Sequence, residues 1–210
     1  MRHPIACILA ILCTRIVAQS SVDPAFLTEI NAHRQQYKNE FISDKHSPLT
    51  ARDTGFLDFF PPDPSWRIAA TVKIIPQSPS FDMLTYSGQK QLYRRYAALQ
   101  FDWNGQVNTL NLYQNLMLIA KDSTYFDYLF LPFKDLTNGG ETYGGGRYLD
   151  FRMRDIENGV LILDFNKNYN PYCAYSDGYS CPIPPRENHL DFEIRAGEKE
   201  FRKEKKQGKH

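Results

Sequence analysis

The stretch that decides the fold runs from Ala97 to Leu112 and reads AALQFDWNGQVNTLNL. Its centre is Asn104-Gly105, and a two-residue type I′ turn needs the positive φ angles that Asn and Gly adopt readily. Pairing the chain across this turn sets Leu99 opposite Leu110 and Ala97 opposite Leu112, so that apolar residues meet on one face. The stretch therefore predicts an antiparallel hairpin with one buried face.

Residues before this hairpin predict further strands. Alternate residues from Trp66 to Ile74 are apolar, as expected for a half-buried strand. Ser87-Gly88 is a turn signal between Phe81–Tyr86 and a strand that starts near Leu92. These strands extend the antiparallel pattern toward the N-terminus.

Residues after the hairpin predict the rest of the sheet. Asn158-Gly159 is a third turn signal and sets Ile156 opposite Leu161. Val160–Phe165 is apolar on both faces, which predicts a central strand, and Leu190–Arg195 is predicted to be the last strand. The fold class expected is mainly β, a compact antiparallel barrel or sandwich.

One amphipathic helix is predicted on the N-terminal side of these strands, over Asp23–Ile42. Asp23 can cap this helix, and Pro24 suits its first turn. We expect the helix to pack on the outside of the sheet, with its histidine as a packed, hydrogen-bonded residue rather than a ligand. Its apolar stripe has spacings of three and four and consists of Phe26, Ile30, His33, Tyr37 and Phe41.

Composition divides the chain into three parts. Residues 1–18 read as a signal peptide, because a short positive start precedes an apolar run that is too short to span a membrane. Residues 23–197 are predicted to form a single β-rich domain. Residues 198–210 carry six Lys or Arg and three Glu, which predicts a charged, disordered tail. We expect an exported product, periplasmic or secreted, with no membrane span after cleavage near Gln19.

Charge and cysteines narrow the function classes. A formal net charge of +1 argues against bulk binding of nucleic acid. Cys173 and Cys181 are the only cysteines beyond the predicted leader, and export favours a disulfide between them. His189 would supply a third zinc ligand, but the spacings match no usual zinc motif and a fourth ligand is lacking. We therefore predict neither a metal nor a cofactor.

A glycine-rich segment, Leu129–Asp150, reads LFLPFKDLTNGGETYGGGRYLD. It lacks the GK[ST] sequence of a phosphate-binding loop, so its glycines indicate a turn where the backbone passes close to a ligand or to a neighbouring chain segment. Glu141, Tyr143 and Arg147 flank these glycines. Glu141 and Arg147 could form an ion pair that braces the loop, or Arg147 could present its guanidinium to a ligand carboxylate or phosphate.

A second dense segment, Asp164–Asn188, reads DFNKNYNPYCAYSDGYSCPIPPREN and has no regular period. Asp164 and Asn166 emerge at the end of a predicted strand, where they either fasten this segment or line a pocket. We expect the Gly139–Arg147 and Asn166–Asn188 loops to lie near each other. The candidate ligand-binding residues are Glu141, Tyr143, Arg147, Asp164, Asn166, Tyr169 and Asn170.

Several strings in the chain also resemble a known family. The specific ones are LFLPFKDLTNGGETYGGGRYLD (Leu129–Asp150) and LDFNKNYNPYCAY (Leu163–Tyr175), with SPLT (Ser47–Thr50) and FPPDP (Phe60–Pro64) before them and CPIPPREN (Cys181–Asn188) and IRAGEK (Ile194–Lys199) after them. They are similar to the bacterial domain-of-unknown-function 1684 family from about Glu29 to Lys199. The resemblance implies no reaction, cofactor or catalytic residue.

Three functions are compatible with these residues. The first is a non-catalytic binding module whose tyrosines and amides hold a small polar ligand, such as a sugar or a peptide. The second is a hydrolase that uses Glu141 or Asp164 as acid–base, with Arg147 as an anion clamp. The third is a structural or assembly protein of the cell envelope, whose ordered loops face a partner.

Overall fold

The computed structural model describes residues 22–203, and the predicted signal peptide lies outside them. In this part of the chain two α-helices, α1 and α2, accompany seven strands and several short 3-10 turns. The helices are Pro24–Ser43 (α1) and Leu116–Lys121 (α2). The strands are Arg67–Ile74 (β1), Ser80–Leu84 (β2), Lys90–Trp103 (β3), Gln106–Asn115 (β4), Tyr128–Phe133 (β5), Arg147–Arg152 (β6) and Val160–Asp164 (β7).

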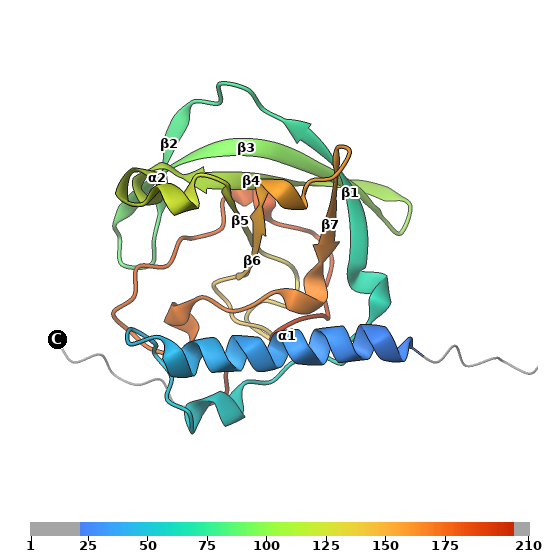
Figure 1. The fold of residues 1–210 in the computed structure, drawn as a ribbon, viewed down its shortest axis with the longest axis vertical. Helices are drawn as coiled ribbons and strands as arrows, with labels where there is room; N and C mark the ends of the chain where they lie inside the picture. The colour runs from blue at the N-terminus through green and yellow to red at the C-terminus, as the bar shows by residue number, and fades with distance from the viewer. Residues whose placement is uncertain (1–21, 204–210) are drawn as a thin grey trace, which may run out of the picture.

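The strands form one curled, half-barrel sheet in the order β6-β5-β4-β3-β1-β7, with β2 paired to β3. All of the strand pairs are antiparallel. In Figure 1 the β3–β4 hairpin arches over the molecule, α1 crosses the opposite side, and irregular C-terminal segments lie between them. The prediction of a mainly β fold with one outer N-terminal helix is confirmed.

The Asn104-Gly105 hairpin has the predicted register, with Leu99 opposite Leu110 and Ala97 opposite Leu112. Asn104 has a φ of 53° and Gly105 a φ of 78°, as a type I′ turn requires. All four apolar partners in this register are fully shielded from solvent. Local turn chemistry and burial on one face therefore specify the same pairing.

The alternation of side chains along β5 and β6 creates two different surfaces. Leu129, Leu131 and Leu149 point into the main hydrophobic core. Phe130 and Tyr148 belong to a separate aromatic cluster on the other face. Because successive side chains of a strand point to opposite faces, one strand pair serves both the core and a second, tyrosine-rich surface.

Helix α1 begins as predicted, since the carboxylate of Asp23 accepts a hydrogen bond from Ala25 N over 2.9 Å. Its residues Phe26, Ile30 and Phe41 are buried. Phe41 packs in a cluster with Tyr175 and Phe201, so this end of the helix lies on C-terminal segments rather than directly on strands. None of the helices in residues 22–203 combines the length and apolarity that crossing a membrane requires.

Two strand predictions are wrong. The turn at Asn158-Gly159 exists, but β7 pairs with β1 at the end of the sheet order, so Val160–Phe165 is not a central strand. Val160 and Ile162 are accordingly exposed at 37% and 48%. Leu190–Arg195 forms no strand, because its backbone runs as an irregular segment fixed by individual bonds such as Leu136 N to Phe192 O.

The predicted start of the disordered tail is also wrong. Glu198 is 1% exposed and Phe201 is 6% exposed, so both are part of the packed body. Lys203 forms an ion pair with Asp53. The ring of Phe201 and the buried carboxylate of Glu198 therefore order a segment that its charged composition predicts to be disordered. Residues 204–210 lie outside the described part of the chain.

Candidate functional site

A cavity of ≈ 1020 Å³ lies between α1, the tyrosine-rich face of β5 and β6, and the segment that follows β7. Helix α1 contributes His33 and Tyr37, among others, to one wall. The opposite wall comes from β5 and β6, and the Tyr169–Pro182 region closes a third side. Strands β1, β3, β4 and β7 add further lining residues, so the cavity gathers side chains from many distant parts of the sequence.

The carboxylate of Asp150 is fixed inside this cavity by two phenols. Tyr128 Oη donates to Oδ1 over 2.6 Å, and Tyr169 Oη donates to Oδ2 over 2.7 Å. Tyr128 and Asp150 come from neighbouring strands, whereas Tyr169 reaches the carboxylate from the segment after β7. Each carboxylate oxygen has further acceptor capacity, so Asp150 can still receive donors from a ligand.

The Asp150 side chain is accessible to solvent, but its carboxylate is partly desolvated by the surrounding protein. This desolvation raises the pKa of Asp150, although the hydrogen bonds from Tyr128 and Tyr169 act in the opposite direction. Burial likewise raises the pKa of both tyrosines well above the usual value, so they remain neutral donors.

A cluster of ion pairs occupies another part of the cavity wall. Arg67 Nη2 lies 2.8 Å from Glu29 Oε1 and 2.7 Å from Asp164 Oδ2. Lys167 Nζ lies 2.7 Å from the same Glu29 oxygen. The two cations thus have carboxylate partners within the protein, and the cluster joins α1 to β1 and to the end of β7.

His33 is a partly buried residue whose ring hydrogen-bonds to the backbone of Lys167, as expected of a packed residue, and it also lines the cavity. Desolvation lowers the pKa of this imidazole, and the nearby Lys167 lowers it further. The neutral ring can accept one hydrogen bond and donate one. His33 therefore offers the cavity wall a hydrogen-bonding group that is uncharged.

Of the seven predicted site residues, Asp164 and Tyr169 line the cavity. Asn166 is buried beside the cluster, where its Nδ2 donates to Asp63 O and to Asp164 Oδ1, both over 2.9 Å. Asn170 is buried too, and its Nδ2 donates to Lys199 O over 2.8 Å. These two asparagines fasten the segment after β7 to the rest of the chain.

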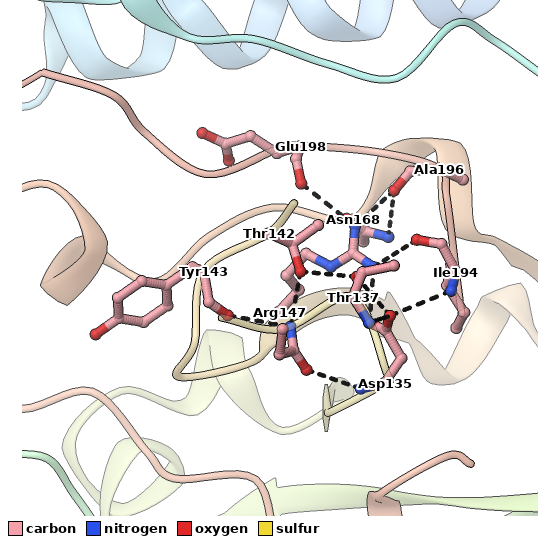
Figure 2. A network of polar contacts seen from close by, with 10 residues as sticks. Asp135, Thr137, Thr142, Tyr143, Arg147, Asn168, Ile194, Ala196 and Glu198 are labelled. Atoms are coloured by element: carbon pink, nitrogen blue, oxygen red, sulfur yellow. Dashed lines mark hydrogen bonds and ion pairs between the residues drawn. The ribbon is translucent and has the colours of Figure 1, made fainter. Parts of the chain in front are cut away.

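Arg147 does not present its guanidinium to a ligand. The side chain is fully buried, and its nitrogens donate to Asp135 Oδ2 and to the carbonyl oxygens of Ile194, Ala196 and Glu198 (Figure 2). The guanidinium thus holds the C-terminal segment against β6. Arg147 is a structural residue, and the predicted anion clamp is wrong.

The predicted ion pair between Glu141 and Arg147 is wrong as well. Glu141 Oε1 instead lies 3.0 Å from Arg195 Nη2, on the exposed surface. Tyr143 packs toward Tyr86, with ring centroids 6.3 Å apart, and is absent from the cavity wall. The residues flanking the glycines therefore point to separate environments.

The glycines themselves mark a close approach between chain segments. A Cβ atom on Gly146 would lie 2.6 Å from Phe133 O and 2.7 Å from Pro184 Cγ, and its φ is +94°. Pro184 belongs to the Asn166–Asn188 loop, so the prediction that the two loops lie near each other is confirmed. The glycine-rich turn accommodates a neighbouring segment rather than a phosphate.

The comparisons agree with the resemblance seen in the sequence. The pattern of a family described as "Protein of unknown function (DUF1684)" matches residues 55–199. The chain belongs to the DUF1684 family. It is also similar to a solution NMR structure of an uncharacterised protein from gene locus rrnAC0354 of Haloarcula marismortui, at 36% identity. That match covers 82% of this chain and 92% of the other, with a TM-score of 0.64. No curated protein matches the chain.

In this DUF1684 chain the predicted disulfide between Cys173 and Cys181 is present, with Cα atoms 6.2 Å apart. Cys181 lines the cavity together with its neighbour Pro182. The carbonyl oxygen of Pro182 accepts a hydrogen bond from Tyr148 Oη. The disulfide therefore fixes a part of the cavity wall.

The sequence-based site omitted Tyr128, His33 and Asp150, three residues that line the cavity of this DUF1684 chain. One of them has a signal in the sequence, because Asp150 stands between the apolar residues Leu149 and Phe151 of the strand RYLDFR. A charged residue at such a position requires partners. Those partners are 22 and 19 residues away, so no local pattern identifies them.

Proposed function

We propose that this chain is a binding module for a small polar ligand that enters the cavity beside α1. The observation that carries the proposal is the Asp150 carboxylate, which two tyrosines hold in one orientation inside a cavity of ≈ 1020 Å³. A concave, largely aromatic site with a few oriented polar groups is typical of small-molecule binding. An acceptor that is already oriented loses little further freedom when a ligand arrives.

A second polar region supports a ligand with more than one polar group. Asn115 Nδ2 donates to Gln91 Oε1 over 2.9 Å, and both amides line the cavity. Each amide has donor or acceptor capacity beyond this bond. A ligand that spans the cavity could meet Asp150 with one group and these amides with another.

The hydrolase alternative has little support in this geometry. It needs Arg147 beside Glu141 or Asp164, but Arg147 is fully buried and Glu141 pairs with Arg195. Asp164 is held by Arg67. The assembly alternative would be favoured by a flat surface at Tyr143, Tyr169 and Asn170. Of these three residues, Tyr169 lines the hollow, whereas Tyr143 and Asn170 lie outside it.

A thermal-shift panel of sugars, amino acids, short peptides and nucleotides tests the proposal on the purified protein. A ligand at a hundred times its dissociation constant stabilises the folded state by about 2.7 kcal/mol. Asp150→Asn should reduce this response by about half or more. Glu193→Gln should retain it, because Glu193 pairs with Arg195 outside the cavity. A response that is the same in Asp150→Asn would contradict the site, and a panel without any response would contradict the function.

We further propose that the protein acts outside the cytoplasm. The apolar leader and the Cys173–Cys181 disulfide support this proposal, because disulfides persist mainly in oxidising compartments. N-terminal sequencing of the protein from a periplasmic or culture fraction should give a start near Gln19. A full-length chain retained in the cytoplasm would contradict export.

A further inference from the structure

We propose that the ligand of this cavity carries an organic ammonium group, which binds to Asp150 within a cage of aromatic side chains. The inference rests on the proposed binding function and names its ligand class. The argument combines the charge that remains unpaired in the cavity with the kind of side chains that surround it.

The charges of the cavity wall favour a cation. Five carboxylates and two cationic side chains line it, and both cations, Arg67 and Lys167, are engaged by Glu29 and Asp164. Asp150 lies outside this cluster, and the hydrogen-bond donors on its oxygens within residues 22–203 are two neutral tyrosines. An anionic ligand would meet excess negative charge here, whereas a cation would compensate it.

Aromatic side chains line the cavity on the same strand pair as this carboxylate. Tyr148 and Tyr169 are perpendicular, with centroids 5.9 Å apart, and Phe130 lies 4.7 Å from Tyr148. Phe130 is directly opposite Asp150 in the β5–β6 register. Cations bind to aromatic faces within about 6 Å of the ring centroid, and such cages recognise alkylated ammonium groups.

A neutral polyol would use this arrangement less well. Hydroxyl groups could donate to Asp150, but they would leave its charge without a counterion in a partly desolvated site. An ammonium group compensates the charge and also contacts the rings. The cavity of ≈ 1020 Å³ is far larger than an ammonium group, so the rest of the ligand extends from the cage toward Gln91 and Asn115.

Acid should weaken the binding of such a ligand. Desolvation raises the pKa of Asp150, so protonation begins at a higher pH than for an ordinary carboxyl group. Tyr128 and Tyr169 contact the carboxylate, and Arg152 and Glu40 act on it electrostatically from β6 and α1. Once Asp150 is protonated, the cage retains its aromatic attraction but loses its charge.

Choline and its uncharged analogue 3,3-dimethyl-1-butanol, here called dimethylbutanol, test the inference directly. The analogue has the shape of choline, with a carbon atom in place of the charged nitrogen. We expect choline to shift the NMR signals of residues around Asp150 and to raise the melting temperature, while dimethylbutanol, glucose and inorganic phosphate have little effect. In Asp150→Asn the affinity for choline should fall about tenfold or more. Tyr169→Phe, which retains the ring and removes one hydrogen bond, should weaken choline binding less than Asp150→Asn.

The outcomes separate the two proposals. An equal response to choline and dimethylbutanol would overturn the ammonium inference but not the binding function. A response to glucose or phosphate, with no response to choline, would have the same consequence. A choline response that is unchanged in both variants would overturn the assignment to Asp150. If neither these probes nor the broader panel binds, both proposals are wrong.

Discussion

Nη2 of Arg147 lies 2.8 Å from Oδ2 of Asp135, and neither side chain is accessible to solvent. Nη1 donates to the carbonyl oxygens of Ala196 and Glu198, and Nη2 donates to that of Ile194 as well (Figure 2). We predict that Arg147→Met lowers the free energy of unfolding by about 3–5 kcal/mol, because it leaves the Asp135 charge buried without its cation. Urea unfolding of the variant and the wild type measures this difference.

A surface ion pair gives the matched control for that experiment. Arg195→Met removes the partner of Glu141, and both of those side chains are exposed, so the loss should be about 1 kcal/mol or less. The double variant Arg147→Met/Asp135→Asn should be more stable than Arg147→Met alone, because it removes the uncompensated charge. A loss in Arg147→Met as small as that in Arg195→Met would contradict the structural role of Arg147.

Gly139 and Gly146 lie in the same loop but require glycine for different reasons. Gly139 requires it for its backbone conformation alone, and Gly146 requires it also because neighbouring segments leave no room for a side chain. Gly139 has a φ of +82° and open space around its Cα, whereas a Cβ on Gly146 would meet Phe133 O and Pro184 Cγ. Gly139→Ala should therefore cost about 1–2 kcal/mol from backbone strain alone. Gly146→Ala should cost roughly 1–3 kcal/mol more, because neighbouring segments must move. Equal losses in urea unfolding would mean that the close approach at Gly146 is relieved easily.

The features that sequence predicts best in this chain are those decided by adjacent residues. Asn104-Gly105 fixes its hairpin because the turn geometry and the apolar pairing agree. Asn158-Gly159 also forms its turn, but the partner of β7 is β1, about 90 residues earlier in the chain, so the local signal does not determine where the strand lies. The limit of prediction is the choice of distant partners.

The cavity illustrates the same limit at a functional level. The unusual composition of its segment points to Tyr169, but the contact of Tyr169 with Asp150 depends on the curl of the sheet and the course of the chain after β7. An arginine beside glycines suits an anion as well as an ion pair that braces the loop, so the sequence leaves both roles open for Arg147. Its four acceptors come from Asp135 and Ile194–Glu198, and nothing near it in sequence indicates them.

Glu198 should make the stability depend on pH. Desolvation raises the pKa of this buried carboxyl group from 4.5 to about 7, against hydrogen bonds from Asn170, Tyr175 and Tyr37. The folded state therefore holds a proton that the unfolded state has lost between these values, so this stabilisation is complete below pH 4.5 and declines as the pH rises toward 7. Melting temperatures measured from pH 4.5 to 8 should show this decline in the wild type.

The variant Glu198→Gln isolates that effect from other titrating groups. It remains neutral at every pH, so its stability should change less than that of the wild type over the same interval. Glu193→Gln, at an exposed ion pair, should retain the wild-type slope. If Glu198→Gln and the wild type have parallel pH profiles, the buried carboxyl group does not titrate as described.

The disulfide links stability to the shape of the cavity. Cys173 and Cys181 are eight residues apart, and closing so short a loop should contribute about 2.5 kcal/mol in the chain-entropy description. Cys173→Ser/Cys181→Ser should therefore unfold at a lower urea concentration. It should also weaken any ligand of the cavity, because Cys181 and Pro182 form part of the wall and Pro182 O accepts from Tyr148.

Thiol titration and binding measurements separate these two effects. The denatured mature protein should show no free thiols before reduction, and two thiols would contradict the disulfide. Reduction of the folded wild type should reproduce the weaker binding of the double variant, which excludes an effect of the serine side chains themselves. If reduction lowers stability but leaves ligand affinity unchanged, the wall at Cys181 keeps its shape without the bridge. The hydrogen bond from Tyr148 to Pro182 would then be sufficient to hold it.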